Sequence, residues 1–418
     1  MTGWADAFRI YLDRRILTVF LLGFSSGLPL ALTGATLAVR LTEAGVSLAA
    51  VGLFALVGLP YTFKFLWAPI MDRAGLPILT PLFGRRRGWM LATQGALIAA
   101  LLALGGVDPA GHPWETAALA LLVAFCSASQ DIVVDAYRVE ILDEAQYGAG
   151  AAAVQFGYRL AMLASGAGAL WLADAVPWPT VYAAMAALVG VGVATVLVNR
   201  EPTTPLAAIG HPRSFLAWTK DAFGGPFLDM IRRHGKGVAL ILVFVVLYKF
   251  GDAMAGVMAN PFYVKIGFTK SEIASVSKVF GFFATILGTA LGGVLVAKLG
   301  IFRSLLVCGV LQAASNLMFA AQAVAGADLQ FLIATIGIEN LSGGMGSAAF
   351  VAYISRLCNI GYTGTQYALL SSLAALGRTG LASWGGFLAE SLGWVDFFLL
   401  STLAALPGIA LIWWVRRV

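Results

Sequence analysis

The chain contains a long series of apolar stretches that are separated by short polar segments. A helix needs roughly 20 mostly apolar residues to cross the hydrocarbon core of a bilayer, and it satisfies its own backbone hydrogen bonds there. The sequence therefore predicts an all-α membrane protein whose first apolar stretch is an uncleaved helix. The expected spans are residues 16–38, 47–68, 89–105, 115–141, 147–173, 178–198, 237–259, 271–296, 301–323, 329–358, 364–390 and 392–415.

The composition excludes other large classes of protein. Hydrophobic residues make up 60% of the 418 residues and charged residues 11%, whereas an average soluble domain is ~25% charged. Neither a water-soluble globule nor a disordered chain has this composition. The three cysteines lie in apolar runs, which excludes a disulfide scaffold. We find no phosphate-binding loop, metal-spaced Cys/His set or nucleophile elbow, so we expect no cofactor, no metal and no enzymatic activity.

Lysine and arginine are distributed unevenly between the two sets of loops. One set carries most of these cations and includes the N-terminus, residues 73–87, the central loop and the C-terminus. The other set carries Arg40, Lys265 and Lys270. Because cytoplasmic loops are rich in Lys and Arg, we expect both termini and the central loop in the cytoplasm, and an even number of spans. The net charge of +6 follows from this bias and does not indicate binding to nucleic acid.

The longest polar stretch, residues 199–236, divides the chain into residues 1–198 and residues 237–418. It contains four prolines and an apolar patch, and we weigh two interpretations of it: an amphipathic helix on the inner membrane surface, and a disordered tether. The two flanking parts are weakly similar to each other. A shift of 216 residues pairs Gly84 with Gly300, at equivalent loops, which indicates an internal repeat.

Ionisable residues inside apolar stretches are costly in lipid, and a set of them indicates a polar cavity. In the fourth span, Asp131, Asp135 and Arg138 lie on one helical stripe. Two carboxylates one turn apart repel each other, and burial disfavours their charged forms, so one of them can hold a proton and couple its entry to transport. The alternative for Asp135 is a static ion pair with Arg138. Arg159 stays charged and either pairs with Asp131 or receives an anionic group of a substrate.

The second part of the chain has a comparable set. Lys249 and Asp252 are three residues apart on a helix, which predicts a local ion pair. Lys278 has no acidic partner in its own predicted helix, which favours an anionic ligand or a partner on another helix, such as Glu339. Further large polar side chains in the spans include Gln130, Gln155, Tyr158, Tyr248, Gln312, Asn316, Asn340, Gln366 and Arg378.

Two features resemble the major facilitator superfamily. Six spans, a cytoplasmic loop and six more spans match the plan of that superfamily, whose halves are repeats of each other. The loop that contains Asp72, Arg73 and residues 84–88 resembles its acidic-basic loop, which pins helix ends on the cytoplasmic side. A generic positive-inside anchor is the alternative interpretation of this loop.

Within that superfamily, the sequence resembles the bacterial anhydromuropeptide permeases of the AmpG type over nearly all of the predicted spans. Residues 23–30 read Gly-Phe-Ser-Ser-Gly-Leu-Pro-Leu, and residues 339–346 read Glu-Asn-Leu-Ser-Gly-Gly-Met-Gly. The other segments that carry the resemblance are residues 63–73, 83–89, 127–135, 147–152, 247–252 and 365–370.

This resemblance implies a major facilitator fold, in which twelve transmembrane helices form two six-helix bundles with a central cavity between the halves. It implies import of N-acetylglucosaminyl-1,6-anhydro-N-acetylmuramyl peptides across the bacterial inner membrane, driven by the proton gradient, for cell-wall recycling and, in some species, β-lactamase induction. Some members of the family carry two extra C-terminal spans, and we expect the twelve-span form here. The expected partners are the substrate, protons and membrane lipids, with the protein as a monomer.

The chemistry of such a substrate suggests roles by residue type. Amide side chains suit its sugar and peptide groups, cations suit the carboxylates of its peptide stem, and tyrosine rings suit a sugar face. The residues expected to couple protons are Asp131, Asp135, Asp252 and Glu339. The residues expected to bind substrate are Gln130, Gln155, Tyr158, Arg159, Tyr248, Lys249, Lys278, Gln312, Asn316, Asn340, Gln366 and Arg378.

Two other functions are weighed against this one. A carrier of the same fold for another sugar, an acyl-nucleotide or a drug would share these features, and competition binding separates it from the first. A membrane enzyme acting on wall sugars would use Asp131, Asp135 and Glu339 as acid and base. The two aspartates lie in mid-helix without a constellation of loop residues around them, which disfavours the enzyme.

Overall fold

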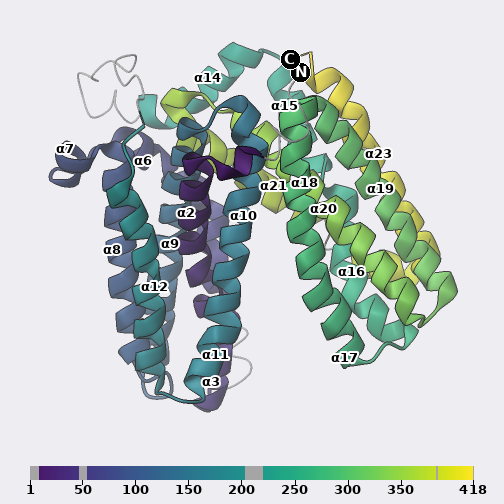
Figure 1. The fold of residues 1–418 in the computed structure, drawn as a ribbon, viewed down its shortest axis with the longest axis horizontal. Helices are drawn as coiled ribbons and strands as arrows, with labels where there is room; N and C mark the ends of the chain where they lie inside the picture. Colours follow the sequence, from purple (N-terminus) through teal and green to yellow (C-terminus); the bar gives the residue numbers. More distant parts are fainter. Residues whose placement is uncertain (1–8, 47–53, 203–219, 383–384, 418) are drawn as a thin grey trace.

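Figure 1 shows the fold of the protein in a computed structural model. The structure describes residues 9–46, 54–202, 220–382 and 385–417. Across these ranges the chain is helical and contains no β-strand, which confirms the predicted all-α class.

The helices before residue 199 are called the first half. They are η1 (Ile10–Leu12), α2 (Arg14–Thr33), α3 (Ala35–Glu43), η2 (Phe54–Gly58), α5 (Leu59–Phe63), η3 (Lys64–Leu66), α6 (Ala68–Arg73), α7 (Leu79–Phe83), α8 (Arg85–Gly106), α9 (Pro113–Ile141), η4 (Glu144–Gln146), α10 (Tyr147–Leu163), η5 (Ala164–Gly168), α11 (Ala169–Ala173) and α12 (Trp178–Val198).

The helices after residue 219 are called the second half. They are η7 (Lys220–Gly224), α14 (Gly225–His234), α15 (Gly237–Leu247), α16 (Phe250–Ile266), α17 (Lys270–Ile273), η8 (Ala274–Phe280), α18 (Gly281–Leu299), α19 (Ile301–Ala325), α20 (Leu329–Leu357), η9 (Ile360–Tyr362), α21 (Thr363–Ala382), α22 (Gly385–Leu392) and α23 (Trp394–Val415).

The described residues contain eight helices that are long and apolar enough to cross a membrane. Four of the expected spans are helical without meeting that criterion. The described part of the second consists of short helices, the eleventh contains α21 and α22, and the fifth and tenth are rich in glycine and polar residues. For these four, a membrane crossing stays a prediction.

The two glycines that the 216-residue shift pairs precede their helices in the same backbone conformation. Gly84 precedes α8 with φ 88° and ψ 172°, and Gly300 precedes α19 with φ 77° and ψ 166°. Side chains other than glycine rarely adopt this conformation. The two glycines that the 216-residue shift pairs therefore make the same turn into the same kind of helix.

The two halves form separate groups of helices in Figure 1, which converge at one end and diverge toward the other. The convergent end holds α14 and the end of α23, and we call it the terminal end. Contacts between the halves join α10 to α18 and α20, and join α6 and α9 to α21.

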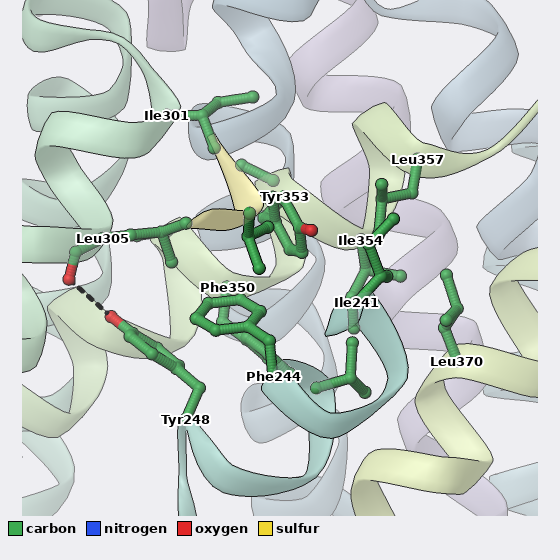
Figure 2. Packing of buried hydrophobic residues seen from close by; sticks show 14 of the residues in the cluster. Ile241, Phe244, Tyr248, Ile301, Leu305, Phe350, Tyr353, Ile354, Leu357 and Leu370 are labelled. Carbon is green, nitrogen blue, oxygen red and sulfur yellow. Dashed lines mark hydrogen bonds between the residues drawn. The ribbon is translucent and has the colours of Figure 1, made fainter. Parts of the chain in front are cut away.

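Each half has its own buried core, and Figure 2 shows part of the core of the second half. Tyr248 lies inside this core, where its ring stacks on Phe350 with centroids 5.4 Å apart. The Tyr248 hydroxyl donates a hydrogen bond of 2.9 Å to the carbonyl oxygen of Leu305. This corrects the expectation that Tyr248 offers its ring to a sugar, because the residue is buried, its ring packs on Phe350 and its hydroxyl is bonded to Leu305.

Candidate functional site

A cavity of about 150 Å³ lies between α2, α9 and α10 of the first half. Its lining includes Asp131 and Asp135 from α9, Gln155 and Tyr158 from α10, and Ser26 from α2. The helical stripe predicted for the two aspartates thus lines this cavity, together with two of the predicted substrate residues. Ser26 was not among the predicted site residues, although it belongs to the motif at residues 23–30.

Close packing of α2 on α10 builds one wall of this cavity. A Cβ atom on Gly23 would lie 2.4 Å from the carbonyl oxygen of Val154, and one on Gly27 would lie 2.4 Å from that of Tyr158. A Cβ on Gly157 would lie 2.1 Å from the carbonyl oxygen of Phe20. These glycines allow the two backbones to approach, which sets the positions of Gln155 and Tyr158.

The two aspartates have different charged neighbours. Asp135 lies 3.5 Å from Arg138 on its own helix and 3.6 Å from the Lys64 ammonium nitrogen of η3. The predicted ion pair with Arg138 is therefore present, and Lys64 is a second partner that the sequence analysis did not assign. Among the described residues Asp131 has no cation within 4.0 Å, and Lys64 interacts with its carboxylate only at longer range.

Arg159 is half-buried and forms neither an ion pair nor a hydrogen bond with any residue in the described part of the chain. The expected pairing with Asp131 is absent from this structure, and an anionic ligand remains the other interpretation. Gln130 is fully buried behind the cavity, where its amide nitrogen donates to Ser25 at 3.0 Å. Its amide oxygen has no partner among the described residues.

A second polar cluster lies in the second half. The Lys249 ammonium contacts Asp252 at 3.2 Å, which confirms the predicted local pair, and it also reaches the carbonyl oxygen of Gly343 at 3.3 Å. The Gln312 amide donates to Asp252 at 3.1 Å. Asn316, one turn from Gln312, is buried with no hydrogen-bond partner for its amide in the described structure.

Glu339 lies on α20 and accepts a hydrogen bond of 2.6 Å from the side chain of Asn340. The Asn340 oxygen in turn accepts from Thr285 of α18 at 2.7 Å. The side chains of Lys278 and Arg378 lie outside the described part of the structure, so the expected approach of Lys278 to Glu339 stays a prediction.

Gln366 lies at the terminal end, and we correct the role expected for it. Its amide nitrogen donates to the Pro226 carbonyl at 3.0 Å and to Asp229 at 2.9 Å, and its oxygen accepts from the Asn359 backbone at 2.7 Å. Residue type and depth in a span suggested a substrate contact. The side chain instead attaches α14 to α21.

Within the predicted linker, residues 220–234 form η7 and α14, as in the helical alternative. Arg233 donates to Asp229 at 2.9 Å and to the Leu357 carbonyl at 3.0 Å, which holds α14 on the second half. Phe227 and Ile231 stay exposed on its outer side. Residues 203–219, with the rest of the predicted apolar patch, lie outside the described residues.

Asp72 closes the terminal end between the two halves. Its buried carboxylate accepts from the backbone of Gly364 at 3.0 Å, and from the backbone and hydroxyl of Thr365 at 2.6 Å each. These amides belong to the first turn of α21, where N–H groups lack helical partners. Arg86 contacts the same carboxylate at 2.8 Å and Glu140 at 2.6 Å. The acidic-basic loop was expected to pin helix ends, but its partner in the second half was not predicted.

Further contacts between the halves lie at the same end. The Arg73 guanidinium pairs with Asp221 and lies 4.7 Å from the centre of the Tyr362 ring. Partial burial raises the pKa of Tyr362, so this ring stays neutral beside the cation. The Tyr11 hydroxyl donates to the Ala290 carbonyl at 2.8 Å. The terminal end is thus closed by several polar contacts that cross between the halves.

Comparisons with known proteins agree with this architecture. Residues 15–378 match the model of the Major Facilitator Superfamily. The chain is 43% identical over 406 residues to the anhydromuropeptide permease of Escherichia coli K12, covering 97% of this chain and 80% of that protein. It is 33% identical to a Rickettsia felis transporter named AmpG 4, covering 98% of each.

Two solved structures share the fold at low sequence identity. The human organic anion transporter MFSD10 superposes with a TM-score of 0.68 at 14% identity, covering 99% of this chain and 100% of that one. The proton:xylose symporter XylE superposes with a TM-score of 0.68 at 12% identity, covering 98% and 96%. At these identities the likeness concerns the fold alone.

Proposed function

The chain belongs to the major facilitator superfamily and, within it, to the family of the Escherichia coli anhydromuropeptide permease, and we propose that it imports anhydromuropeptides across the bacterial inner membrane by alternating access. The similarity to that permease extends over nearly the whole chain, and this observation carries the proposal. The relatives are permeases and transporters, not enzymes.

The proposed architecture has twelve spans in two six-helix bundles, with residues 199–236 between them. The terminal end faces the cytoplasm in this arrangement, because the loops there carry most of the Lys and Arg residues. The polar contacts between the halves at the terminal end support a state that is closed toward the cytoplasm and open toward the opposite side.

The substrate site is proposed to lie between the halves, with Arg159 as the residue that receives a carboxylate of the peptide stem. Arg159 supports this role because it has no ionic partner among the described residues and lies in a predicted span, four residues from cavity-lining Gln155. Tyr158 offers a ring face to a sugar. The proposed site also includes Gln130, Lys249, Lys278, Gln312, Asn316, Asn340 and Arg378.

Asp131 is the residue proposed to take up the coupling proton. It lines the cavity and forms no ion pair within 4.0 Å among the described residues, whereas Asp135 forms ion pairs with Lys64 and Arg138. An unpaired carboxylate is easier to protonate than one held by cations. Asp252 and Glu339 are the corresponding candidates in the second half.

Uptake of labelled anhydro-disaccharide peptide into proteoliposomes tests this proposal. We expect accumulation under an inward proton gradient, and its loss when an uncoupler is added. In Asp131→Asn, gradient-driven accumulation is lost while exchange of substrate across the membrane continues. Asp143→Asn serves as the matched control, because this carboxylate is 79% exposed and far from the cavity lining.

Two outcomes contradict parts of the proposal. If free N-acetylglucosamine or unrelated drugs compete as well as the anhydro-disaccharide, the substrate assignment is wrong. If Asp131→Asn accumulates substrate as the unmodified protein does, another group takes up the proton.

A further inference from the structure

Arg138 is a fully buried cation whose partners lie on both sides of the boundary between the halves. One terminal nitrogen lies 3.5 Å from the Asp135 carboxylate of its own helix. The other donates to the Ser355 hydroxyl of α20, in the second half, at 3.2 Å. The guanidinium also lies 5.0 Å from the centre of the Tyr367 ring on α21. Arg138 is therefore joined to the cavity at one end and to the opposite half at the other.

Arg138 depends on a single carboxylate, whereas Lys64 interacts with Asp135 and, at longer range, with Asp131. Asp135 is the acid within 4.0 Å of both Arg138 and Lys64 in the described structure, and the side chains of these two cations are 0% and 10% exposed. Buried cations are costly without a counter-charge. Ser355 supplies a hydroxyl and Tyr367 a ring face, which are neutral partners. The contact with the second half therefore depends on Asp135 remaining charged.

Arg86, the other fully buried arginine at this end, shows what a purely structural arrangement looks like. It contacts both Asp72 and Glu140, so two carboxylates balance one cation. Arg138 has one carboxylate within 4.0 Å, that of Asp135, and Lys64 contacts this same carboxylate. The environment of Arg138 is therefore sensitive to whether Asp135 is charged or neutral.

We propose that Arg138 is the coupling residue that transmits the charge of Asp135, in the cavity, to the closure of the terminal end. This inference rests on the proposed transport function. When Asp135 is neutralised, or when a cationic group of a substrate engages it, Arg138 is left without a carboxylate partner among the described residues. The protein relieves this cost by releasing Ser355 and Tyr367 and admitting water, which parts the halves at the terminal end. By linkage, closing that end stabilises the charged form of Asp135.

Distances between spin labels test the coupling without substrate, so the result does not depend on which compound is transported. One label pair, at Leu82 and Ile360, reports the terminal end, where both side chains are exposed. A second pair, at Ala110 and Ala327, reports the opposite end. The three buried native cysteines are replaced before labelling.

Asp135→Asn removes the charge and keeps the shape of the side chain. We expect the ratio of terminal-end-open to terminal-end-closed protein to rise about tenfold, because a charge-assisted contact of the closed state is lost. The label pair at the opposite end shortens in the same variant. Asp143→Asn, which removes an exposed carboxylate at the same end, leaves both distance distributions unchanged.

The decisive measurement is the same substitution in an Arg138→Met background. Without the guanidinium there is nothing to transmit the change, so Asp135→Asn shifts the populations less than twofold there. An equal shift in both backgrounds overturns the proposal, because Asp135 then acts without Arg138. An absent shift in the Arg138-containing protein overturns it as well.

A variant that leaves the cavity untouched covers the case in which Asp135→Asn fails to fold. Removing both neutral partners with Ser355→Ala and Tyr367→Leu shifts the populations in the same direction, and an unchanged ratio overturns the proposal. The transport assay separates the two conclusions. If the label distances behave as stated while anhydromuropeptide is not taken up, the substrate assignment fails and the coupling role stands.

Discussion

Replacing Asp72 with asparagine tests whether the terminal end is held closed by a carboxylate on the first turn of α21. Both carboxylate oxygens are used: one accepts from Gly364 and contacts Arg86, and the other accepts twice from Thr365. An asparagine amide group therefore points its N–H donors at other donors in either orientation. The closed state loses hydrogen bonds that water replaces once the end opens.

The structure sets the size of this effect. A hydrogen bond to a charged group contributes ~1.5–3 kcal/mol. Three such bonds share one carboxylate, and Arg86 keeps its contact with Glu140, so we take a total loss of about 3 kcal/mol from the closed state. This value corresponds to a shift of about a hundredfold in the ratio of open to closed protein.

The assay is the distance distribution between labels at Leu82 and Ile360, recorded in detergent or lipid nanodiscs. Asp72→Asn moves the distribution to longer distances, and Glu140→Gln is the matched control. Glu140 belongs to the same buried ion network through Arg86, but it has no described contact with the second half. The control therefore lowers thermal stability without changing the ratio. An unchanged ratio in Asp72→Asn, or an equal shift in Glu140→Gln, refutes the reasoning.

Three further predictions concern packing at other places. Gly148→Val places a Cβ 2.6 Å from the Cβ of Val296 across the boundary between the halves, which destabilises the closed state by about 1–3 kcal/mol through overpacking. We expect the terminal end to open, as measured by the labels at Leu82 and Ile360. Gln366→Leu leaves the Asp229 carboxylate with one hydrogen-bond donor fewer, so we expect a lower melting temperature and an unchanged substrate affinity in equilibrium binding. A loss of affinity at an unchanged melting temperature contradicts the structural role of Gln366. Tyr248→Phe removes one core hydrogen bond worth about 1 kcal/mol, so we expect lower thermal stability and retained uptake. Lost uptake at unchanged thermal stability indicates that Tyr248 contacts the substrate.

Much of the fold was predictable because it depends on local pattern. Apolar stretches located the helices, and the spacing of Asp131 and Asp135 placed both on one cavity-facing stripe. The 216-residue repeat identified two glycines that make the same turn. Helical periodicity and backbone conformation are properties of neighbouring residues, so one sequence contains enough information for them.

The orientation of single side chains in the spans was less predictable. Tyr248 and Gln366 have the residue types and depth expected for substrate contacts, yet one packs in the core and the other joins α14 to α21. In a membrane protein both the cavity and the helix contacts accept polar groups, so composition does not separate them. Only the packing of neighbouring helices decides which face a residue occupies.

The sequence by itself determined that this chain is helical, that it belongs with membrane carriers, and which helix carries the paired aspartates. The tertiary structure alone decided the contacts between residues far apart in the chain, such as Asp72 with Thr365 and Lys64 with Asp135. The physical reason is that helix formation and insertion into lipid are governed by local composition. A contact between helices depends on how two surfaces meet, and that information is shared between distant parts of the chain.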